Sequence, residues 1–234
     1  MCGRYSLATP DHRSIRARFP VGESVEIRQR FNVAPTDEVL AVTTDKQGVP
    51  RGELLRWGLV PSWAKGPSVA GAKMINARVE TAASKPAFRR AFERYRCLII
   101  ADGFYEWRRT SGSRQPFRIT RDDHEPFAFA GLWSIWHGDQ ERTLRTCTIL
   151  TTVANDAIAT LHDRMPVILT PGHEDEWLDL ETPPGRLHEI LAGLPARHTE
   201  VVEVCSAVND VRNDGPECLQ VPGEPRATEQ QALF

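Results

Sequence analysis

The sequence lacks an apolar run long enough to cross a membrane. Its longest runs, such as CLIIA at residues 97–101, fall far short of the roughly 20 residues that a spanning helix needs. The first residues, MCGRYSLATPDHRSIRARF, carry arginines where a secretory signal peptide has its apolar core. These absences exclude a helical membrane protein and a signal peptide, and they predict a soluble protein of the cytoplasm.

Metal-ligand spacing is also absent. The five cysteines, at positions 2, 97, 147, 205 and 218, include no pair two to four residues apart, and no histidine pair completes a zinc site. Disulfides are not expected in a reducing cytosol. Cys97 and Cys147 lie in apolar, β-branched runs, which predicts small core side chains, and Cys205 and Cys218 look similarly structural. Cys2 differs because it directly follows Met1.

Lysine is scarce, with four residues at positions 46, 65, 73 and 85, so most of the positive charge is arginine. The formal net charge of −2 hides an asymmetry. Residues 1–118 hold 21 Lys and Arg against 11 Asp and Glu, whereas residues 119–234 hold 8 against 20. A basic half can attract a polyanion, and the planar guanidinium suits phosphate. The alternative is that the two halves interleave in the fold and their charges cancel.

What is present is an ordinary globular composition. Of the 234 residues, 41% are hydrophobic and 26% are charged, which excludes collagen, a coiled coil and wholesale disorder. The sequence contains no internal repeat and no low-complexity linker, so we expect one domain over residues 1–221. The remaining residues, 222–234, are polar and predict a frayed tail.

Short β-type runs dominate the secondary-structure pattern. We expect strands at residues 4–7, 39–44, 53–59, 97–101, 116–120, 127–135, 143–153 and 201–205. Helices are expected from the Thr9 cap to about residue 19, from Ser84 to about 95, from the Asn155 cap to 161, and at 174–180 and 186–192. This order predicts an α+β fold with a mainly antiparallel, curved or barrel-like sheet and peripheral helices.

Cys2 becomes the terminal residue if Met1 is removed. It then carries a thiol and a free α-amine on adjacent carbons, with ordinary pKa values of about 8.5 and about 7.7–8.0. Such a 1,2-aminothiol condenses with an aldehyde: the amine forms an imine, and the sulfur then adds to close a thiazolidine ring. On position alone, an incidental second residue in a disordered terminus is the more common case.

Motifs further along the sequence favour a functional role for Cys2. CGRY at residues 2–5 leads into a strand, and it is followed by FNVAPT (31–36), RWGLVPSWAK (56–65), INARVET (75–81), DGFYEWRR (102–109) and LHDRMPVIL (161–169). In these motifs the sequence closely resembles the SRAP family, the SOS response-associated peptidases, whose eukaryotic relatives shield abasic sites in single-stranded DNA. The resemblance covers residues 2 to about 219.

The resemblance implies a catalytic set. Cys2 corresponds to the family's nucleophile, Asn76 to its active-site asparagine, Glu106 to its glutamate and His162 to its histidine. Each role suits the chemistry: a carboxyl for acid–base work, an imidazole that titrates near neutrality, and an amide that both donates and accepts. Taken singly, Glu106 would more often face solvent from a strand, His162 would be a surface residue or helix cap, and Asn76 a turn former.

The resemblance also implies DNA contacts. Arg78 and Arg164 match family positions that hold the phosphates beside the lesion, and Arg4 is a third candidate. Trp107 is expected beside the aldehyde, where it can stack on a base. Four further residues are expected to shape the DNA-binding groove: Asn32, Pro35, Trp57 and Trp63. At least one of the two tryptophans is expected in the core.

Three functions fit these features. The first is an abasic-site sensor of single-stranded DNA, or of single-strand/duplex junctions, that forms a thiazolidine crosslink, needs no metal or organic cofactor, and acts as a nucleoid-associated monomer. A lyase side reaction is expected because a β-elimination lyase also attacks the lesion with an amine and forms an imine. The second is a thiol peptidase, or autopeptidase, that uses Cys2 with His162. The third is a non-catalytic single-strand binding module.

Overall fold

The structure, a computed structural model, describes residues 2–66, 73–110, 112–138 and 142–223, with the side chains of residues 109, 110 and 113 excepted. Its strands are β1 (Tyr5–Leu7), β2 (Arg30–Val33), β3 (Glu38–Thr44), β4 (Pro50–Trp57), β5 (Asn76–Arg78), β6 (Arg96–Ala101), β7 (Gly103–Thr110), β8 (Ser113–Arg121), β9 (Phe127–His137), β10 (Thr143–Val153), β11 (Arg164–Pro166), β12 (Ile168–Leu169) and β13 (Thr199–Glu203). Its helices are α1 (His12–Arg18), α3 (Val79–Ala82), α4 (Arg89–Arg94), α5 (His173–Leu178) and α6 (Pro184–Ile190), with short 3₁₀ turns η2 (Ala196–His198), η3 (Ser206–Asn209) and η4 (Pro216–Leu219).

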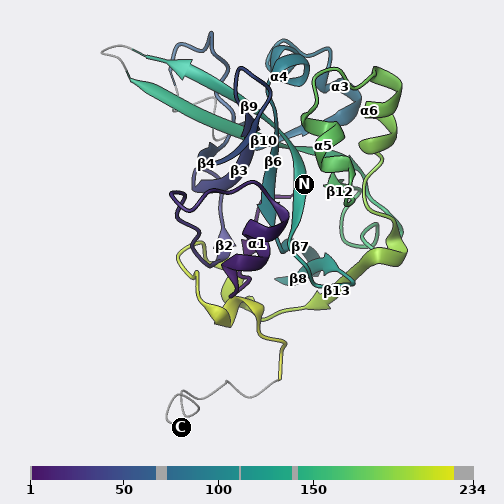
Figure 1. Cartoon of the computed structure of the whole chain (residues 1–234). Coiled ribbons are helices and arrows are strands. Elements are labelled where there is room, and N and C mark those ends of the chain that lie inside the picture. The colour runs from purple at the N-terminus through teal and green to yellow at the C-terminus, as the bar shows by residue number, and fades with distance from the viewer. Residues whose placement is uncertain (1, 67–72, 111, 139–141, 224–234) are drawn as a thin grey trace.

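Five strands close into a barrel. β4 pairs with β3, β3 with β6, β6 with β9, and β9 with β10, and β10 then returns to β4 through a parallel ladder. The long β9–β10 ribbon projects from one end of this barrel (Figure 1). Closure leaves these strands without a free edge over their paired lengths. The expected α+β fold with a mainly antiparallel, barrel-like sheet is confirmed.

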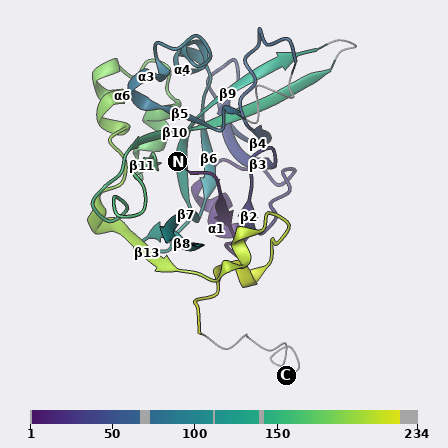
Figure 2. The same cartoon turned by 180° about the vertical axis from the view of Figure 1, so that it is seen from behind.

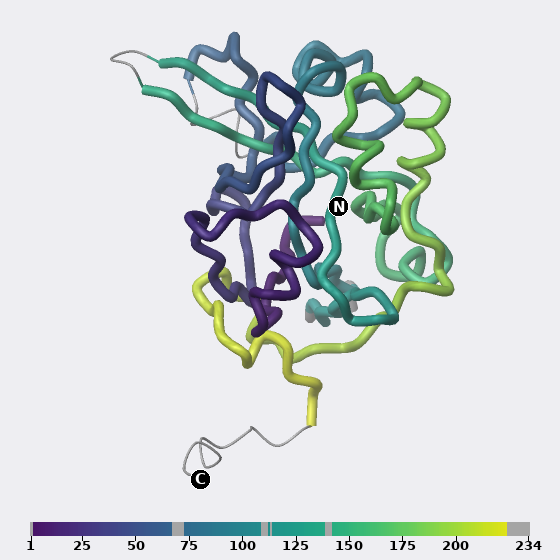
Figure 3. Tube along the Cα trace, viewed as in Figure 1, coloured from purple at the N-terminus to yellow at the C-terminus, as the bar shows by residue number. Residues whose placement is uncertain are grey.

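A second sheet covers one end of the barrel. Its strands run in the order β13-β8-β7-β1-β2, and every ladder in it is antiparallel. The helices lie around the outside of the barrel, with α5 and α6 along one flank (Figures 1 and 2), and Arg18 of α1 pairs with Glu174 of α5 at 2.7 Å. In the Cα trace, the start of the chain lies in the middle of the molecule (Figure 3).

Alternating side chains of the barrel strands supply two separate apolar clusters, as the two-residue period of a strand requires. In β3, Val39 and Ala41 belong to a cluster that also holds Tyr5 and Phe104 of the second sheet. Leu40 and Val42 belong to the other cluster, which takes in helix residues such as Ile15, Ala91, Trp177 and Leu187. Burial of each large apolar side chain contributes about 1.5–3 kcal/mol. The first cluster therefore fixes the second sheet, and with it the N-terminal strand, against the barrel.

The eight expected strands are all present, with ends shifted by a few residues. Five strands were not expected: β2, β5, β7, β11 and β12. Four of these have four residues or fewer, so they carry too little alternation to be recognised in the sequence. Two of the short ones, β5 and β11, position site residues.

The first helix begins later than expected. Asp11 caps α1, because its side chain accepts a hydrogen bond from the Arg13 backbone N–H at 2.9 Å. The expected cap, Thr9, instead donates from Oγ1 to buried Asp102 at 3.0 Å. The prediction of a Thr9 cap was wrong because a tertiary partner takes the hydroxyl away from the helix.

Two other helix predictions need correction. α4 begins at Arg89 rather than at Ser84, after a turn in which the Phe88 N–H donates to the Lys85 carbonyl. Asn155 does act as a cap, accepting from the backbone N–H groups of Ala157 and Ile158 at 3.1 and 3.2 Å. The segment it caps forms turns and not an α-helix.

Among the described residues, no helix has the length and apolarity needed to span a bilayer. The expected tail at residues 222–234 lies outside the described part of the chain from residue 224 onward.

Candidate active site

The N-terminal strand places Cys2 inside the molecule. β1 lies between β2 and β7, with Tyr5 opposite Val33 on one side and Phe104 on the other. The Cys2 side chain is completely buried, and its thiol donates to the Arg4 carbonyl at 3.6 Å. The alternative of a disordered second residue does not fit this placement.

Asp102 holds β1 in register. Its carboxylate accepts hydrogen bonds from the Ser6 hydroxyl at 2.7 Å and the Ala8 backbone N–H at 2.6 Å, and it pairs with the Arg118 guanidinium at 2.9 Å. Charge-assisted bonds of this kind are stronger than neutral ones, and here they converge on one buried group. Because β1 has only three residues, this carboxylate contributes much of what fixes the position of Cys2.

Asn76 reaches Cys2 from a different part of the chain. It is the first residue of β5, which runs parallel to β10 with Asn76 opposite Ile149. Its Nδ2 donates to the Cys2 carbonyl at 2.7 Å. Its Oδ1 is buried and accepts no hydrogen bond from any residue that the structure describes. The amide therefore holds Cys2 by one end and offers an acceptor at the other.

Glu106 lies in β7 opposite Phe117 and is buried, which excludes the solvent-facing alternative. Burial raises the pKa of its carboxyl, while the positive charge of a protonated His162 lowers it. Burial also raises the pKa of the Cys2 thiol well above its usual range, and the negative charge of Glu106 raises it further. Glu106 thus lies within electrostatic reach of both Cys2 and His162.

His162 precedes β11 at the end of a turn in which its N–H donates to the Ile158 carbonyl at 3.1 Å. Its Nδ1 accepts from the Arg164 backbone N–H at 2.9 Å and also lies 2.8 Å from Asp163 Oδ1. One nitrogen cannot satisfy both partners: the neutral ring accepts from Arg164 and carries its proton on Nε2, whereas the protonated ring pairs with Asp163. The ring is 31% exposed, so part of it is accessible to solvent.

The predicted DNA contacts divide by exposure. Arg78 is exposed at the end of β5, and Trp63 is 67% exposed. Trp107 is half-buried, and its Nε1 donates to Asn209 Oδ1 at 2.5 Å. Pro35 lies half-buried in the loop between β2 and β3. These four side chains are accessible to a ligand at the surface.

The other predicted contacts are engaged within the protein. Trp57 is buried, and its Nε1 donates to the Ile75 carbonyl at 2.9 Å, so it is the core tryptophan of the pair. Arg4 Nη1 donates to Asn32 Oδ1 at 2.7 Å and to the Val208 carbonyl at 3.0 Å.

The amide nitrogen of Asn32 in turn donates to the backbone carbonyls of Asp210 at 3.0 Å and Asn213 at 2.7 Å. Asn32 therefore ties the segment after β13 to β2. Arg164 is buried and forms a two-point ion pair with Glu80.

Two residues near the site had no role in the sequence prediction, Glu80 and Asp102. Glu80 lies in the INARVET motif, two positions after Arg78, and that spacing was the available signal. Asp102 begins the DGFYEW motif, but nothing in the sequence indicates its partners in β1 and β8. No group of three or more His, Cys, Asp or Glu side chains that could hold a metal ion occurs within the described ranges.

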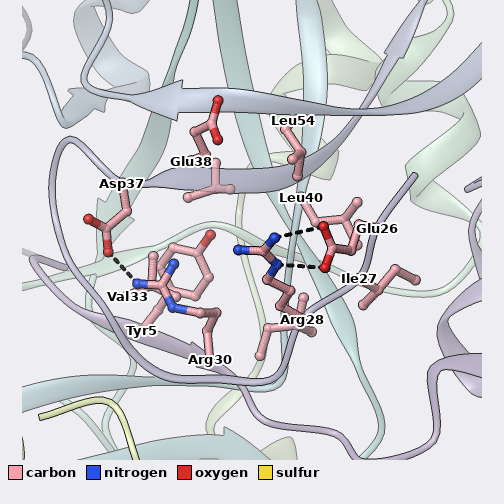
Figure 4. Close-up of a pocket in the computed structure, with 12 residues that line it drawn as sticks. Tyr5, Glu26, Ile27, Arg28, Arg30, Val33, Asp37, Glu38, Leu40 and Leu54 are labelled. Carbon is pink, nitrogen blue, oxygen red and sulfur yellow. Dashed lines mark hydrogen bonds and ion pairs between the residues drawn. The ribbon is translucent and has the colours of Figure 1, made fainter. Parts of the chain in front are cut away.

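A separate hollow of about 370 Å³ lies between β1, β2, β3 and β4 (Figure 4). Four of the charged side chains that line it are paired: Arg28 binds Glu26 through two hydrogen bonds of 2.8 Å, and Arg30 binds Asp37 at 2.6 Å. Tyr5 lines it as well, but Cys2 and the other predicted catalytic residues do not. This pocket is therefore distinct from the candidate site.

Known proteins resemble this chain over nearly its full length. The family model described as SOS response associated peptidase (SRAP) matches residues 1–211. The abasic site processing protein YoaM of Bacillus subtilis is 44% identical, covering 94% of this chain and 97% of that protein. The abasic site processing protein YedK of Escherichia coli is 31% identical, covering 94% and 99%.

Solved structures agree on the fold. A protein of Bacteroides thetaiotaomicron superimposes with a TM-score of 0.81 at 23% identity, covering 94% of this chain and 99% of that one. The chain thus combines a barrel, a covering sheet and a buried Cys2 with a sequence that matches one family model over residues 1–211. The chain belongs to the SOS response-associated peptidase (SRAP) family.

Proposed function

We propose that this protein captures abasic sites in single-stranded DNA by forming a thiazolidine between Cys2 and the ring-opened aldehyde. The observation that carries the proposal is the placement beside Cys2 of an amide from β5 and a buried carboxyl from β7, with His162 close enough to that carboxyl to influence its pKa. The names of the relatives, abasic site processing proteins, support the lesion as the target.

The first step uses the α-amine that is released when Met1 is removed. The amine nitrogen attacks the aldehyde carbon and gives a carbinolamine, which loses its hydroxyl as water to form an imine. Because burial raises the pKa of Glu106, this carboxyl keeps its proton more readily than an exposed glutamate does. It can donate that proton to the departing hydroxyl, which is general acid catalysis.

The second step closes the ring. The Cys2 sulfur bonds to the imine carbon, and the thiol proton passes to the nitrogen, so that a neutral five-membered ring forms with no oxidant or reductant. Burial and Glu106 disfavour a standing thiolate. This order, amine first and sulfur second, requires the thiolate only at the moment of addition to an electrophilic imine.

Asn76 and His162 complete the reaction. Asn76 holds the Cys2 carbonyl and offers its buried Oδ1 to the amine, which orients the lone pair of the nitrogen toward the aldehyde. We assign His162 to the sugar ring oxygen, which must be protonated when the closed sugar opens. Elimination from the same imine would give strand cleavage, so a lyase side reaction is part of the proposal.

DNA binding is assigned to the accessible side chains. Arg78 pairs with a phosphate, and Trp63 and Trp107 stack on bases. Pro35 shapes the groove directly, whereas Arg4, Asn32, Trp57 and Arg164 shape it from within through the contacts described above. We propose that the protein binds as a monomer, in the cytoplasm at the nucleoid, and at junctions of single-stranded and duplex DNA.

A thiol peptidase built on Cys2 and His162 is less consistent with this site. Thiol peptidases work with a thiolate stabilised by a nearby cation. Here burial and a neighbouring carboxyl act in the opposite direction on the pKa of Cys2. Removal of the chain's own Met1 remains compatible with the proposal, and a purely non-covalent binding module would leave the buried Glu106 without a purpose.

Intact mass spectrometry after mixing the protein with an abasic oligonucleotide tests the proposal. The expected mass is that of the chain without Met1 plus the oligonucleotide, minus one water. A protein acetylated at the terminal amine but free at the thiol should give no adduct. Peptidase activity would survive that acetylation, and a plain binding module would give no covalent product in either form.

A further inference from the structure

Two groups of the proposed site reach it from opposite edges of β10. On one edge, β5 runs alongside with Asn76 opposite Ile149 and Arg78 opposite Thr151. On the other, β11 pairs so that Pro166 lies opposite Thr151. The asparagine and the histidine therefore belong to different strand segments, separated by β10.

One ion pair crosses this gap. Glu80, in the short helix directly after β5, accepts from Arg164 Nη1 at 2.5 Å and Nη2 at 2.9 Å, and Nη2 also donates to the Thr151 carbonyl at 2.5 Å. Over the described part of the chain, this is the one side-chain hydrogen-bonded link between the segments 73–82 and 161–166. The Arg164 side chain is only 9% exposed, so the pair is well shielded on that side.

The same arginine orients the histidine. The backbone N–H of Arg164 donates to His162 Nδ1, which selects the neutral tautomer with its proton on Nε2. The Arg164 backbone is held by its ladder partner Val153 in β10, and the Arg164 guanidinium is held by Glu80, so both contacts anchor the residue that orients the imidazole. Glu80 is the side chain that binds both terminal nitrogens, Nη1 and Nη2, of the Arg164 guanidinium.

Glu80 also places a negative charge near Arg78, the proposed DNA contact. Its side chain is 46% exposed. Its pKa is lowered by the hydrogen bonds from Arg164, and in addition by the charges of Arg164 and Arg78. It is therefore ionised near neutrality and close enough to Arg78 to oppose an approaching phosphate.

We infer that Glu80 is a positioning residue for covalent capture: it aligns Arg164 and His162 across β10, and its charge weakens DNA binding at Arg78. This inference rests on the proposed function. It gives an unusual signature, because removing the charge while keeping the side-chain shape should improve binding and impair chemistry. A residue that served folding alone would, when changed, weaken both.

The test compares Glu80→Gln with the wild type in two assays. Binding is measured on a single-stranded oligonucleotide with a tetrahydrofuran abasic analogue, which has no aldehyde. We expect binding about two- to fivefold tighter, as for loss of one exposed charge interaction. Crosslinking of a true abasic oligonucleotide is measured at saturating DNA, and we expect it to slow about tenfold through misalignment.

Controls separate the possible causes. Glu176→Gln removes a similar two-point pair, between Glu176 on α5 and Arg186 on α6 at 2.5 and 2.7 Å, and should change neither assay. Glu80→Asp keeps the charge and should bind DNA as the wild type does while crosslinking slowly. In a His162→Ala background, Glu80→Gln should slow crosslinking less than twofold further, because both changes act on one group.

Weaker binding by Glu80→Gln, or additive rate losses with His162→Ala, would overturn the inference. If Glu80→Gln lowers the melting temperature too far for assay, Glu80→Asp decides, since unchanged crosslinking in that variant also overturns it. A wild-type protein that forms no adduct would instead refute the proposed function, and this outcome is visible before any variant is compared.

Discussion

The side-chain amide of Asn76 donates to the backbone carbonyl of Cys2 at 2.7 Å, linking the start of the chain to a strand 74 residues later. This bond acts on the backbone of Cys2, not on its thiol. It therefore restricts the direction in which the nitrogen and the sulfur point, which is what a two-step condensation at one residue requires.

Asn76→Ala should slow crosslinking without weakening DNA binding. The variant loses the hold on the Cys2 carbonyl and the buried Oδ1 acceptor, and a misplacement of the nucleophile of about 1 Å costs on the order of 100-fold in rate. Crosslinking rates on abasic DNA and affinity for the tetrahydrofuran analogue check this. Loss of affinity equal to the loss of rate would show that Asn76 serves the DNA groove instead.

Cys2→Ala should abolish the stable adduct and leave non-covalent binding intact, since affinity is assigned to arginine and tryptophan side chains and permanence to the thiol. Cys2→Ser retains a terminal amine and should give an adduct only after borohydride reduction of the imine. Denaturing gels check both variants, with Cys205→Ala as the control. A heat-stable adduct with Cys2→Ala would refute the assignment of the nucleophile.

Arg78→Ala should make DNA binding less sensitive to salt. Log affinity is expected to fall linearly with log salt concentration, with a slope of roughly −0.7 per phosphate neutralised on a single strand. In this variant the slope should become less negative by the contribution of about one phosphate. Affinities measured at several salt concentrations check it, with the exposed Arg13 changed to alanine as the control. An unchanged slope would place Arg78 outside the groove.

Crosslinking should depend on pH on both sides of an optimum. At low pH the α-amine, with an ordinary pKa of about 7.7–8.0, is protonated and cannot attack. At high pH Glu106 loses the proton that its raised pKa favours, so the hydroxyl departs more slowly. Rates across pH 5 to 9 should give this bell shape, and Glu106→Gln should lose the alkaline limb and slow by about 100- to 10,000-fold.

His162→Ala should differ from Glu106→Gln in the step that it affects. Compared with Glu106→Gln, it should slow capture less on lesions that are already ring-opened, and it should slow exchange of a preformed adduct onto fresh DNA more. The measurement is the pair of rates, for formation and exchange, in both variants. Equal losses in both rates for Glu106→Gln and His162→Ala would refute the division of roles between them.

Asp102→Asn should destabilise the protein by about 2–4 kcal/mol, because a buried carboxylate that pairs with Arg118 is replaced by an amide that cannot accept all of its bonds. Urea unfolding measures this loss. Crosslinking at a temperature where the variant remains folded should also slow, since β1 loses its anchor. Unchanged stability would show that the apolar contacts of Tyr5 alone hold the strand.

The sequence by itself determined the fold class, the identity of the chemical groups and most of the long strands, although the eight-residue β7 was not predicted. Strands such as β10 carry enough alternation to be predicted to the residue, and Cys2, Asn76, Glu106 and His162 stand in motifs dense enough to indicate a family. Tertiary structure decided which partner each polar group takes. Thr9 bonds Asp102 instead of capping a helix, and Trp57 is buried while Trp63 is exposed.

The same holds for Arg164, which the sequence offers as a phosphate contact and the fold pairs with Glu80. The physical reason is the separation along the sequence over which each kind of interaction acts. Hydrophobic periodicity and capping act over a few residues, so they can be read locally. Hydrogen bonds and ion pairs join side chains that lie 84 or 96 positions apart, and only the folded chain brings these side chains within 3 Å of each other.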